Sequence, residues 1–212
     1  LFGGGFTVKR YWVNEIFYSL QGEGLRAGTA NVFVRFKGCN LKCSEAPGPK
    51  SIGGFDCDTE FESGVAMSAV DIVSAASAAC GSDSGNVIFT GGEPAVQLDR
   101  GLVEAFKSSK WYTVIETNGS IDVSGLGLDF ICVSPKVAEH CVRQLTADEV
   151  RYVRGAGQGL PKPACDAGAK LLSQAFNGLE SDTGAIRTCV DLVKKHPEWR
   201  LSIQQHKMWG IR

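Results

Sequence analysis

The sequence predicts an α/β fold, namely an incomplete, open barrel of parallel strands with helices on the outside. Seven short strand-like runs recur along the chain, and helical stretches fall between several of them. This alternation is typical of a parallel sheet, and seven strands are too few for a closed eight-stranded barrel. The length of 212 residues suits one domain. We therefore expect a single domain over residues 1–212.

The seven predicted strands are rich in β-branched and aromatic residues and are bounded by turn-forming residues. In chain order they cover residues 31–37, 86–90, 112–116, 129–134, 150–154, 171–176 and 199–205. The stretches 44–56 and 155–168 are rich in Gly and Pro. Both are predicted to be loops.

Three helices are predicted between these strands. The first, 68–80, opens with Ser68 and has Asp71 three positions later, a variant of the capping box. The other two each place apolar residues at helical spacing on one face. These are 98–109, with Leu102, Val103 and Phe106, and 183–196, with Ile186, Val190 and Val193.

Composition excludes several classes of function. The chain has 22 basic and 23 acidic side chains, so neither a nucleic acid nor an anionic membrane is a favoured partner. It has no run of 18 apolar residues, and its first ten residues lack the apolar core of a secretion signal. Eight irregularly spaced cysteines do not indicate a disulfide framework. We expect a cytoplasmic, reducing environment.

Three of the cysteines lie in one segment directly after the predicted strand 31–37. Cys39 and Cys43 are spaced C-x3-C, and Cys57 follows after 13 residues that contain the insertion 44–56. Three thiolates around a [4Fe–4S] cubane leave one iron free for a chelating cofactor. Two other interpretations remain open from this segment: a zinc site, although structural zinc normally takes four ligands, and unrelated thiols in a Gly/Pro loop.

A second motif, Gly91-Gly92-Glu93-Pro94, comes directly after the predicted strand 86–90. The glycines allow the backbone to approach a bound molecule closely, and Glu93 can accept a hydrogen bond from an ammonium group. Alone, the motif is equally typical of a simple turn that ends at a proline. Its position about 50 residues after the cysteine segment strengthens the case for a cofactor site.

Together these motifs resemble the radical S-adenosylmethionine (SAM) superfamily, whose usual signature is C-x3-C-x2-C. This chain has x13 in place of x2, a weak objection because loop closure costs only about 0.6 kcal/mol per doubling of length. Ordered blocks along the chain resemble more specifically the 7-carboxy-7-deazaguanine synthase family. The blocks are YSLQGEG, VRFKGCNLKC, CDTEF, TGGEP, IETNGS, ICVSPK and SIQQHKMWGIR, and the resemblance is weakest between residues 137 and 183.

The resemblance implies an open barrel of the radical SAM type and a lyase activity. Members convert 6-carboxy-5,6,7,8-tetrahydropterin to 7-carboxy-7-deazaguanine with loss of ammonia, in 7-deazapurine (queuosine-type) biosynthesis. In such enzymes an electron from the reduced cluster cleaves SAM, and the resulting 5′-deoxyadenosyl radical removes hydrogen from C6 of the pterin. The implied cofactors are a [4Fe–4S] cluster, SAM and Mg²⁺. The implied partners are the pterin, an electron-donor protein such as a flavodoxin, and a second copy of the chain in a homodimer.

Site residues follow from the resemblance position by position. The implied cluster ligands are Cys39, Cys43 and Cys57, and Thr59 is the implied Mg²⁺ ligand. The implied SAM contacts are Asp56, Cys57, Asp58, Gly92, Glu93, Ser134, Pro135, Lys136, Gln174 and Asn177. The implied substrate contacts are Leu20, Gln21, Gly22, Glu23, Arg35, Thr90 and Arg212. A guanidinium such as that of Arg35 suits the substrate carboxylate, although without the family match it is equally a surface arginine.

Two alternative functions remain. A glycyl-radical activase would share the cluster and SAM but would act on a protein, and we recognise no additional docking domain for such a partner. A zinc-stabilised binding module would have no catalytic activity. Iron and sulfide content distinguishes the cluster from zinc.

Overall fold

The computed structural model describes residues 9–41, 43, 60–177 and 180–211. Its main sheet has nine strands in the order β11-β8-β7-β6-β5-β4-β2-β1-β3. The strands are β1 (Tyr11–Leu20), β2 (Ala30–Phe36), β3 (Val65–Met67), β4 (Asn86–Gly91), β5 (Tyr112–Thr117), β6 (Phe130–Val133), β7 (Thr146–Arg154), β8 (Asp166–Gln174) and β11 (Trp199–Leu201). The edge strands β11 and β3 are not paired with each other. The predicted open barrel is therefore confirmed.

Seven strands of this sheet run parallel: β2, β4, β5, β6, β7, β8 and β11. They coincide with the seven predicted runs, although β8 begins at Asp166 and so includes part of the predicted loop 155–168. The last predicted strand, 199–205, was too long. The strand ends at Leu201, and Gln205 begins the helix α4 (Gln205–Trp209). The antiparallel strands β1 and β3 were not predicted.

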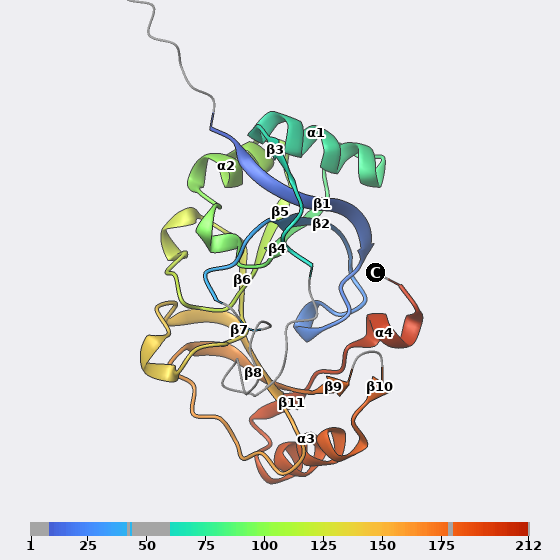
Figure 1. Cartoon of the computed structure of the whole chain (residues 1–212), viewed down its shortest axis with the longest axis vertical. Helices are drawn as coiled ribbons and strands as arrows, with labels where there is room; N and C mark the ends of the chain where they lie inside the picture. Colours follow the sequence, from blue (N-terminus) through green and yellow to red (C-terminus); the bar gives the residue numbers. More distant parts are fainter. Residues whose placement is uncertain (1–8, 42, 44–59, 178–179, 212) are drawn as a thin grey trace, which may run out of the picture.

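The helices begin close to their predicted positions. They are α1 (Ala69–Cys80), α2 (Arg100–Ser108) and α3 (Thr183–Lys195). At the start of α1, the side chain of Ser68 accepts a hydrogen bond from the Asp71 N–H, and the Asp71 carboxylate accepts one from the Ser68 N–H. The predicted capping box is confirmed. Helices α1 and α2 lie at one end of the molecule and α3 at the other (Figure 1).

The largest part of the core lies between the sheet and helices α1 and α2. Phe106 of α2 is fully buried and makes edge-on contacts with Phe89 and Trp111, at ring-centroid distances of 5.4 and 5.5 Å. Its neighbours Leu102 and Val103 are also buried, which confirms the predicted face of α2. Burying one such side chain contributes about 1.5–3 kcal/mol.

The predicted face of α3 was wrong in part, since Val193 packs against the core but Val190 does not. Ala185 and Cys189 are its buried residues, whereas Val190 is exposed. Leu192 and Val193 pack beside them against the core under β7, β8 and β11. Small side chains let the helix approach the sheet closely, so size outweighed hydrophobicity in choosing the buried face.

The predicted alternation of strand and helix holds only in part. Between β5 and β8 the connections contain short 3-10 turns, η3 (Ser124–Leu126) and η4 (Glu139–Cys141), and no α-helix. The outer face there is covered instead by α3 and by loop residues such as Val142 and Cys165. No helix in the described part of the chain combines the length and apolar character needed to cross a membrane.

The inner face of the barrel is closed at the amino-terminal ends of its strands. Arg26, in η1 (Gly24–Arg26), donates to the side chains of Asn31 and Asn86, both at 3.2 Å. Its guanidinium also lies 4.8 Å from the Tyr112 ring centroid and 5.9 Å from that of Phe130. These four partners begin or precede strands β2, β4, β5 and β6, so Arg26 plugs one end. The opposite end, where the parallel strands finish, holds the candidate site.

Candidate active site

The two sequence motifs come together where β2 and β4 end. The Glu93 N–H donates to the carbonyl of Gly38 at 3.0 Å, and the Gly92 N–H donates to that of Phe36 at 3.3 Å. A Cβ on Gly92 would lie 2.6 Å from the Gly38 carbonyl carbon and 2.9 Å from the Cys39 Cβ. Any side chain at Gly92 would therefore separate the GGEP turn from the cysteine segment.

Two of the three predicted cluster ligands lie in the described residues. The Leu41 N–H donates to the Cys39 Sγ at 3.4 Å, the kind of N–H···S bond that stabilises a thiolate ligand. Among the described residues, no group of three or more His, Cys, Asp or Glu side chains could hold a metal ion. The predicted residues Asp56, Cys57, Asp58, Thr59 and Arg212, and the insertion 44–56, lie outside the described residues.

The two ends of the cysteine segment are held beside each other. The Gly38 N–H donates to the carbonyl of Phe61 at 2.8 Å. Glu60, just before Phe61, accepts hydrogen bonds from the side chain of Asn14 on β1 and from the backbone of Ser63. The segment thus leaves and returns at one point of the barrel rim.

Asn40, between the two cysteines, is held by the turn that follows β5. Its Nδ2 donates to the Ser120 Oγ at 2.8 Å, and its Oδ1 accepts from the Asn118 Nδ2 at 3.1 Å. Asn118 and Ser120 belong to the IETNGS block. We call these three residues the asparagine clamp. It fixes the first part of the cysteine segment to the turn after β5, which lies next to the GGEP turn.

Glu93 connects the GGEP turn to the same β5 turn. Its carboxylate, 1% exposed as a residue, accepts hydrogen bonds from the Thr117 Oγ1 at 2.6 Å and from the N–H groups of Asn118 and Ala95 at 2.7 and 3.0 Å. Burial raises the pKa of Glu93, and these three hydrogen bonds oppose the rise. Its carboxylate is therefore committed to the protein, and the predicted contact with the SAM amino group stays a prediction.

The predicted SAM segments also lie at this end of the barrel. The Lys136 Nζ donates to the Ser134 Oγ at 2.8 Å. Burial lowers the pKa of Lys136, with Arg151 acting in the same direction and Glu23 and Cys43 opposing it. Lys136 is thus an interior lysine between the cysteine segment and the barrel interior.

Two polar atoms of β8 have no hydrogen-bond partner among the described residues. They are the Gln174 Oε1 and the Ser173 Oγ, in residues that are 4% and 1% exposed. Buried polar groups are normally paired. Successive strand residues point to opposite faces, and Leu172 packs in the outer core, so of these two only the Ser173 Oγ faces the barrel interior and is available to a molecule bound there. Ser173 was not predicted. Asn177 is in the short strand β9 (Phe176–Asn177), and its side chain lies outside the described residues.

Arg35 and Thr90 are neighbours on the inner face, as partners in the β2–β4 register. Arg35 also forms an ion pair with Glu15 on β1, with Nε 2.8 Å from Oε1. Its side chain is 23% exposed, so it is not the surface arginine of the alternative interpretation. In this state Glu15 neutralises the guanidinium that we expect to bind the substrate carboxylate.

The predicted substrate contacts Leu20, Gln21, Gly22 and Glu23 lie where β1 ends. We call residues 20–24 the substrate loop, and it folds into the barrel. The Gln21 Nε2 donates to the Glu116 Oε1 at 2.7 Å, and the Gln21 Oε1 accepts from the Glu23 N–H at 3.1 Å. Leu20 differs, because alternation along β1 turns its side chain to the face opposite Phe17, and it is 37% exposed. A contact from Leu20 would therefore use its backbone.

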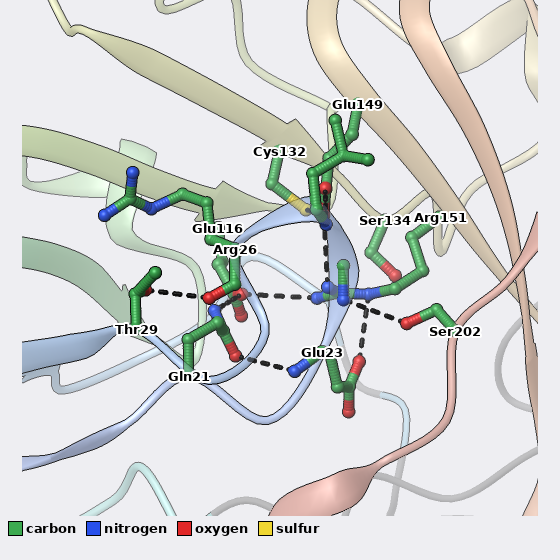
Figure 2. Close-up of polar contacts among 12 residues, drawn as sticks. Gln21, Glu23, Arg26, Thr29, Glu116, Cys132, Ser134, Glu149, Arg151 and Ser202 are labelled. Atoms are coloured by element: carbon green, nitrogen blue, oxygen red, sulfur yellow. Dashed lines mark hydrogen bonds and ion pairs between the residues drawn. The ribbon is translucent and has the colours of Figure 1, made fainter.

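Sequence reasoning missed the buried arginine beside this loop. Arg151 of β7 forms ion pairs with Glu23, Glu116 and Glu149, at N–O distances of 2.9, 3.3 and 3.2 Å. Figure 2 shows its guanidinium between these carboxylates. The only sequence signal was a charged residue at an inward position of the predicted strand 150–154.

Helix α4, near the carboxyl-terminal end of the described residues, packs against the substrate loop. The Gln205 N–H donates to the carbonyl of Gly22 at 2.9 Å, and a Cβ on Gly22 would lie 2.7 Å from the His206 Cβ. The sequence had assigned His206 no role. Nearby, the buried thiol of Cys132 donates to the Glu149 Oε1 at 3.1 Å.

Comparisons with known proteins give one consistent result. Similar proteins include three named 7-carboxy-7-deazaguanine synthase: from Bradyrhizobium diazoefficiens (37% identical over 211 residues), Nitratidesulfovibrio vulgaris (38% over 221) and Bacteroides thetaiotaomicron (36% over 200). The matches cover 94–95% of this chain and 98–99% of each relative. No family model matches the chain.

A solved structure supports the fold independently. The crystal structure of QueE from Escherichia coli has a TM-score of 0.67 and 23% sequence identity, and the match covers 93% of this chain and 95% of that one. Sequence identity above one third over nearly the whole length, together with a shared fold, leaves a single conclusion. The chain belongs to the 7-carboxy-7-deazaguanine synthase family.

Proposed function

We propose that this chain is a radical SAM lyase that converts 6-carboxy-5,6,7,8-tetrahydropterin to 7-carboxy-7-deazaguanine with loss of ammonia, for 7-deazapurine biosynthesis of the queuosine type. The family supplies the reaction. The observation that carries the proposal in this chain is the docking of the GGEP turn on the cysteine segment, above a polar barrel interior. Membership of this family sets aside the activase and the zinc module.

The described residues fit a cluster and SAM. Cys39 and Cys43 lie on a segment held by the GGEP motif and the asparagine clamp. Because Gly92 has no side chain, the GGEP turn can lie directly against Gly38 and Cys39. The buried, unpartnered oxygen of Ser173, on the inner face of β8, suits a hydrogen-bond donor of a bound molecule. When bound, the cluster and SAM supply the radical that starts the ring contraction.

The third cluster ligand in this proposal is Cys57. It precedes Phe61 by four residues, a stretch that can span at most about 14 Å, and Phe61 is hydrogen-bonded to Gly38 beside Cys39. The covalent chain therefore permits Cys57 to join Cys39 and Cys43. Mg²⁺ on Thr59 belongs to the same proposal, since a hydroxyl oxygen suits this hard cation.

The chain's own residues orient the substrate and exclude water. Arg35 would bind the carboxylate of the pterin through its guanidinium fork, with Thr90 beside it. Gln21, Glu23 and the backbone of Leu20 and Gly22 would pair with the N–H and carbonyl edges of the ring. The Arg26 plug and the apolar inner residues Phe33, Ile88 and Val114 keep water from the other end.

Several further elements complete the proposal. Arg212 would lie near the substrate, Asp56 and Asp58 near SAM, and Pro135 and Asn177 with them. We propose one domain over residues 1–212, a homodimer, a flavodoxin-like electron donor and a cytoplasmic location.

Anaerobic reconstitution tests this function. The chain is loaded with iron and sulfide, reduced with dithionite, and incubated with SAM and the carboxypterin, and 7-carboxy-7-deazaguanine is measured by mass spectrometry. We expect Cys57→Ser to lose iron and product, and Cys80→Ser, which changes a thiol on α1, to retain both. A wild-type chain with a full cluster and no product would overturn the reaction. Product formed by Cys57→Ser would overturn only the ligand assignment.

A further inference from the structure

We propose that Arg151 is a positioning residue that orients the Glu23 carboxylate for the pterin; the inference rests on the proposed function. Its side chain is 6% exposed, at the centre of the barrel interior. No contact between Arg151 and the substrate is needed for this role, because it acts through Glu23.

Each nitrogen of the Arg151 guanidinium is directed to a carboxylate from a different part of the chain. Nε lies 2.9 Å from Glu23 of the substrate loop, Nη2 lies 3.3 Å from Glu116 of β5, and Nη1 lies 3.2 Å from Glu149 of its own strand. The guanidinium is planar and presents its donors in a fixed fork. Fixing two of its nitrogens on β5 and β7 therefore fixes the direction of the third (Figure 2).

Glu149 is the anchor of this arrangement. It is 2% exposed, and its carboxylate also accepts from the Cys132 Sγ at 3.1 Å and from the Leu25 N–H at 2.7 Å. A Cβ on Gly24 would lie 2.8 Å from its carboxyl carbon. With these contacts Glu149 has no room for a ligand and serves to hold Arg151 and the loop.

Glu23 and Arg151 also belong to a closed ring of hydrogen bonds. Arg151 binds Glu116, Glu116 accepts from the Gln21 Nε2, and the Gln21 Oε1 accepts from the Glu23 N–H, whose side chain returns to Arg151. The ring holds Glu23 at both its backbone and its side chain. Among the described residues, Arg151 forms an ion pair with the Glu23 Oε2, and no hydrogen bond or ion pair reaches the Glu23 Oε1.

The charge balance gives Arg151 a second effect on Glu23. Three carboxylates surround one guanidinium, and their side chains are 14%, 25% and 3% exposed for Glu23, Glu116 and Glu149. Arg151 lies among all three, and the nearby Lys136 also interacts with Glu23. Arg151 therefore lowers the electrostatic cost of holding the Glu23 side chain beside two other carboxylates.

The test compares Arg151→Gln, Arg151→Lys and Tyr152→Phe in the reconstituted, SAM-loaded chain. Tyr152 lies on the outer face of the same strand, where its hydroxyl donates to Glu139 at 2.8 Å, so its variant controls for general loosening of β7. We expect Arg151→Gln to raise KM for the carboxypterin at least about tenfold, with iron content and KM for SAM unchanged. Tyr152→Phe should leave all three values unchanged.

Rescue by the conservative variant separates positioning from a merely structural role. Arg151→Lys keeps the cation but lacks the fixed fork of donors. It should therefore recover part of the loss in KM for the carboxypterin, with kcat less affected than KM in both arginine variants. In the double variant, Glu23→Gln with Arg151→Gln, KM for the carboxypterin should be no higher than in the single variant with the higher KM.

An unchanged KM for the carboxypterin in Arg151→Gln, or equal effects in Tyr152→Phe, would overturn the inference. If Arg151→Gln does not fold, Arg151→Lys decides, and a wild-type KM there would overturn it as well. A wild-type chain that forms product while the arginine variants behave normally refutes only the role of Arg151. A wild-type chain that forms no product refutes the proposed function, and the inference with it.

Discussion

Gly22 of the substrate loop lies against His206 of α4, so the loop after β1 and the last helix meet at one side of the barrel interior. The Cβ that any other residue would place at Gly22 falls 2.7 Å from the His206 Cβ, and the Gln205 N–H is bonded to the Gly22 carbonyl. The substrate loop is therefore packed between β7 on one side and the carboxyl-terminal helix on the other (Figure 1).

Gly22→Ala should separate these two segments. Overpacking of this kind costs about 1–3 kcal/mol, and the displaced loop should raise KM for the carboxypterin while iron content stays the same. Gly125→Ala is the matched control, because a Cβ there would meet nothing within 4 Å. Thermal unfolding and steady-state kinetics of both variants check this. Equal behaviour of the two would show that the Gly22–His206 contact has no such effect.

The asparagine clamp should stabilise the cysteine segment as a unit. Asn118→Ala and Asn40→Ala each remove the bond between their side chains, 3.1 Å long, so the double variant should lose less than the sum of the singles, by about 0.5–1.5 kcal/mol. Urea unfolding of the cluster-free protein gives this coupling. In the reconstituted protein, each single variant should release iron to a chelator faster than the wild type. Additive losses would mean that the two residues act independently.

Glu60 should make stability depend on pH at the point where the cysteine segment returns. Hydrogen bonds from the Ser63 backbone and the Asn14 side chain lower the pKa of Glu60 to about 2 from 4.5. The folded state therefore favours the carboxylate, and this contribution is complete above pH 4.5 and is lost as pH falls from 4.5 toward 2. Urea unfolding should show the wild type more stable than Glu60→Gln at pH 7, with the difference shrinking below pH 4.5.

Glu62→Gln is the control for that titration. Glu62 is an exposed neighbour whose carboxylate accepts no hydrogen bond from the described residues. Its replacement should leave the acid dependence of stability unchanged. The assignment to Glu60 fails if both variants reduce the pH dependence of the unfolding free energy to the same extent.

Three interior thiols should resist alkylation in the folded protein. Burial raises the pKa of Cys165 and of Cys189 to about 11, and it raises the pKa of Cys132 further. At pH 8 about one thiol in a thousand would then be ionised at Cys165 and Cys189. Mass spectrometry after brief iodoacetamide treatment should find these three unmodified, and modified in urea. Cys80 and Cys141, which are half-buried, should react in both conditions.

The parallel strands were predictable because each carries its own local signal. A buried run such as 86–90 is apolar on both faces, and its limits are marked by turn residues. Strand β1 was missed because its burial does not alternate simply, and its register with β2 shifts between Val13 and Glu15. The buried face of α3 was missed because Ala185 and Cys189 are less apolar than Val190, and only the sheet beneath decides which side fits.

The candidate site was predictable where the chemistry lies in contiguous motifs. Cys39, Cys43 and the GGEP turn belong to short blocks that follow predicted strands. Arg151 was not predictable in this way, since its three partners come from the substrate loop, β5 and β7, which only the folded barrel brings together. The same holds for Gly22 and His206. Long-range pairing, which has no local sequence signature, accounts for most of what was missed.

The hydrogen bond from the Gly24 N–H to the Ser202 Oγ joins positions 178 residues apart. During synthesis, the amino-terminal loop emerges from the ribosome long before the residue that anchors it. The loop therefore cannot form this hydrogen bond until residue 202 has left the ribosome. A nascent chain shorter than that lacks one of the contacts that hold the substrate loop in the folded barrel.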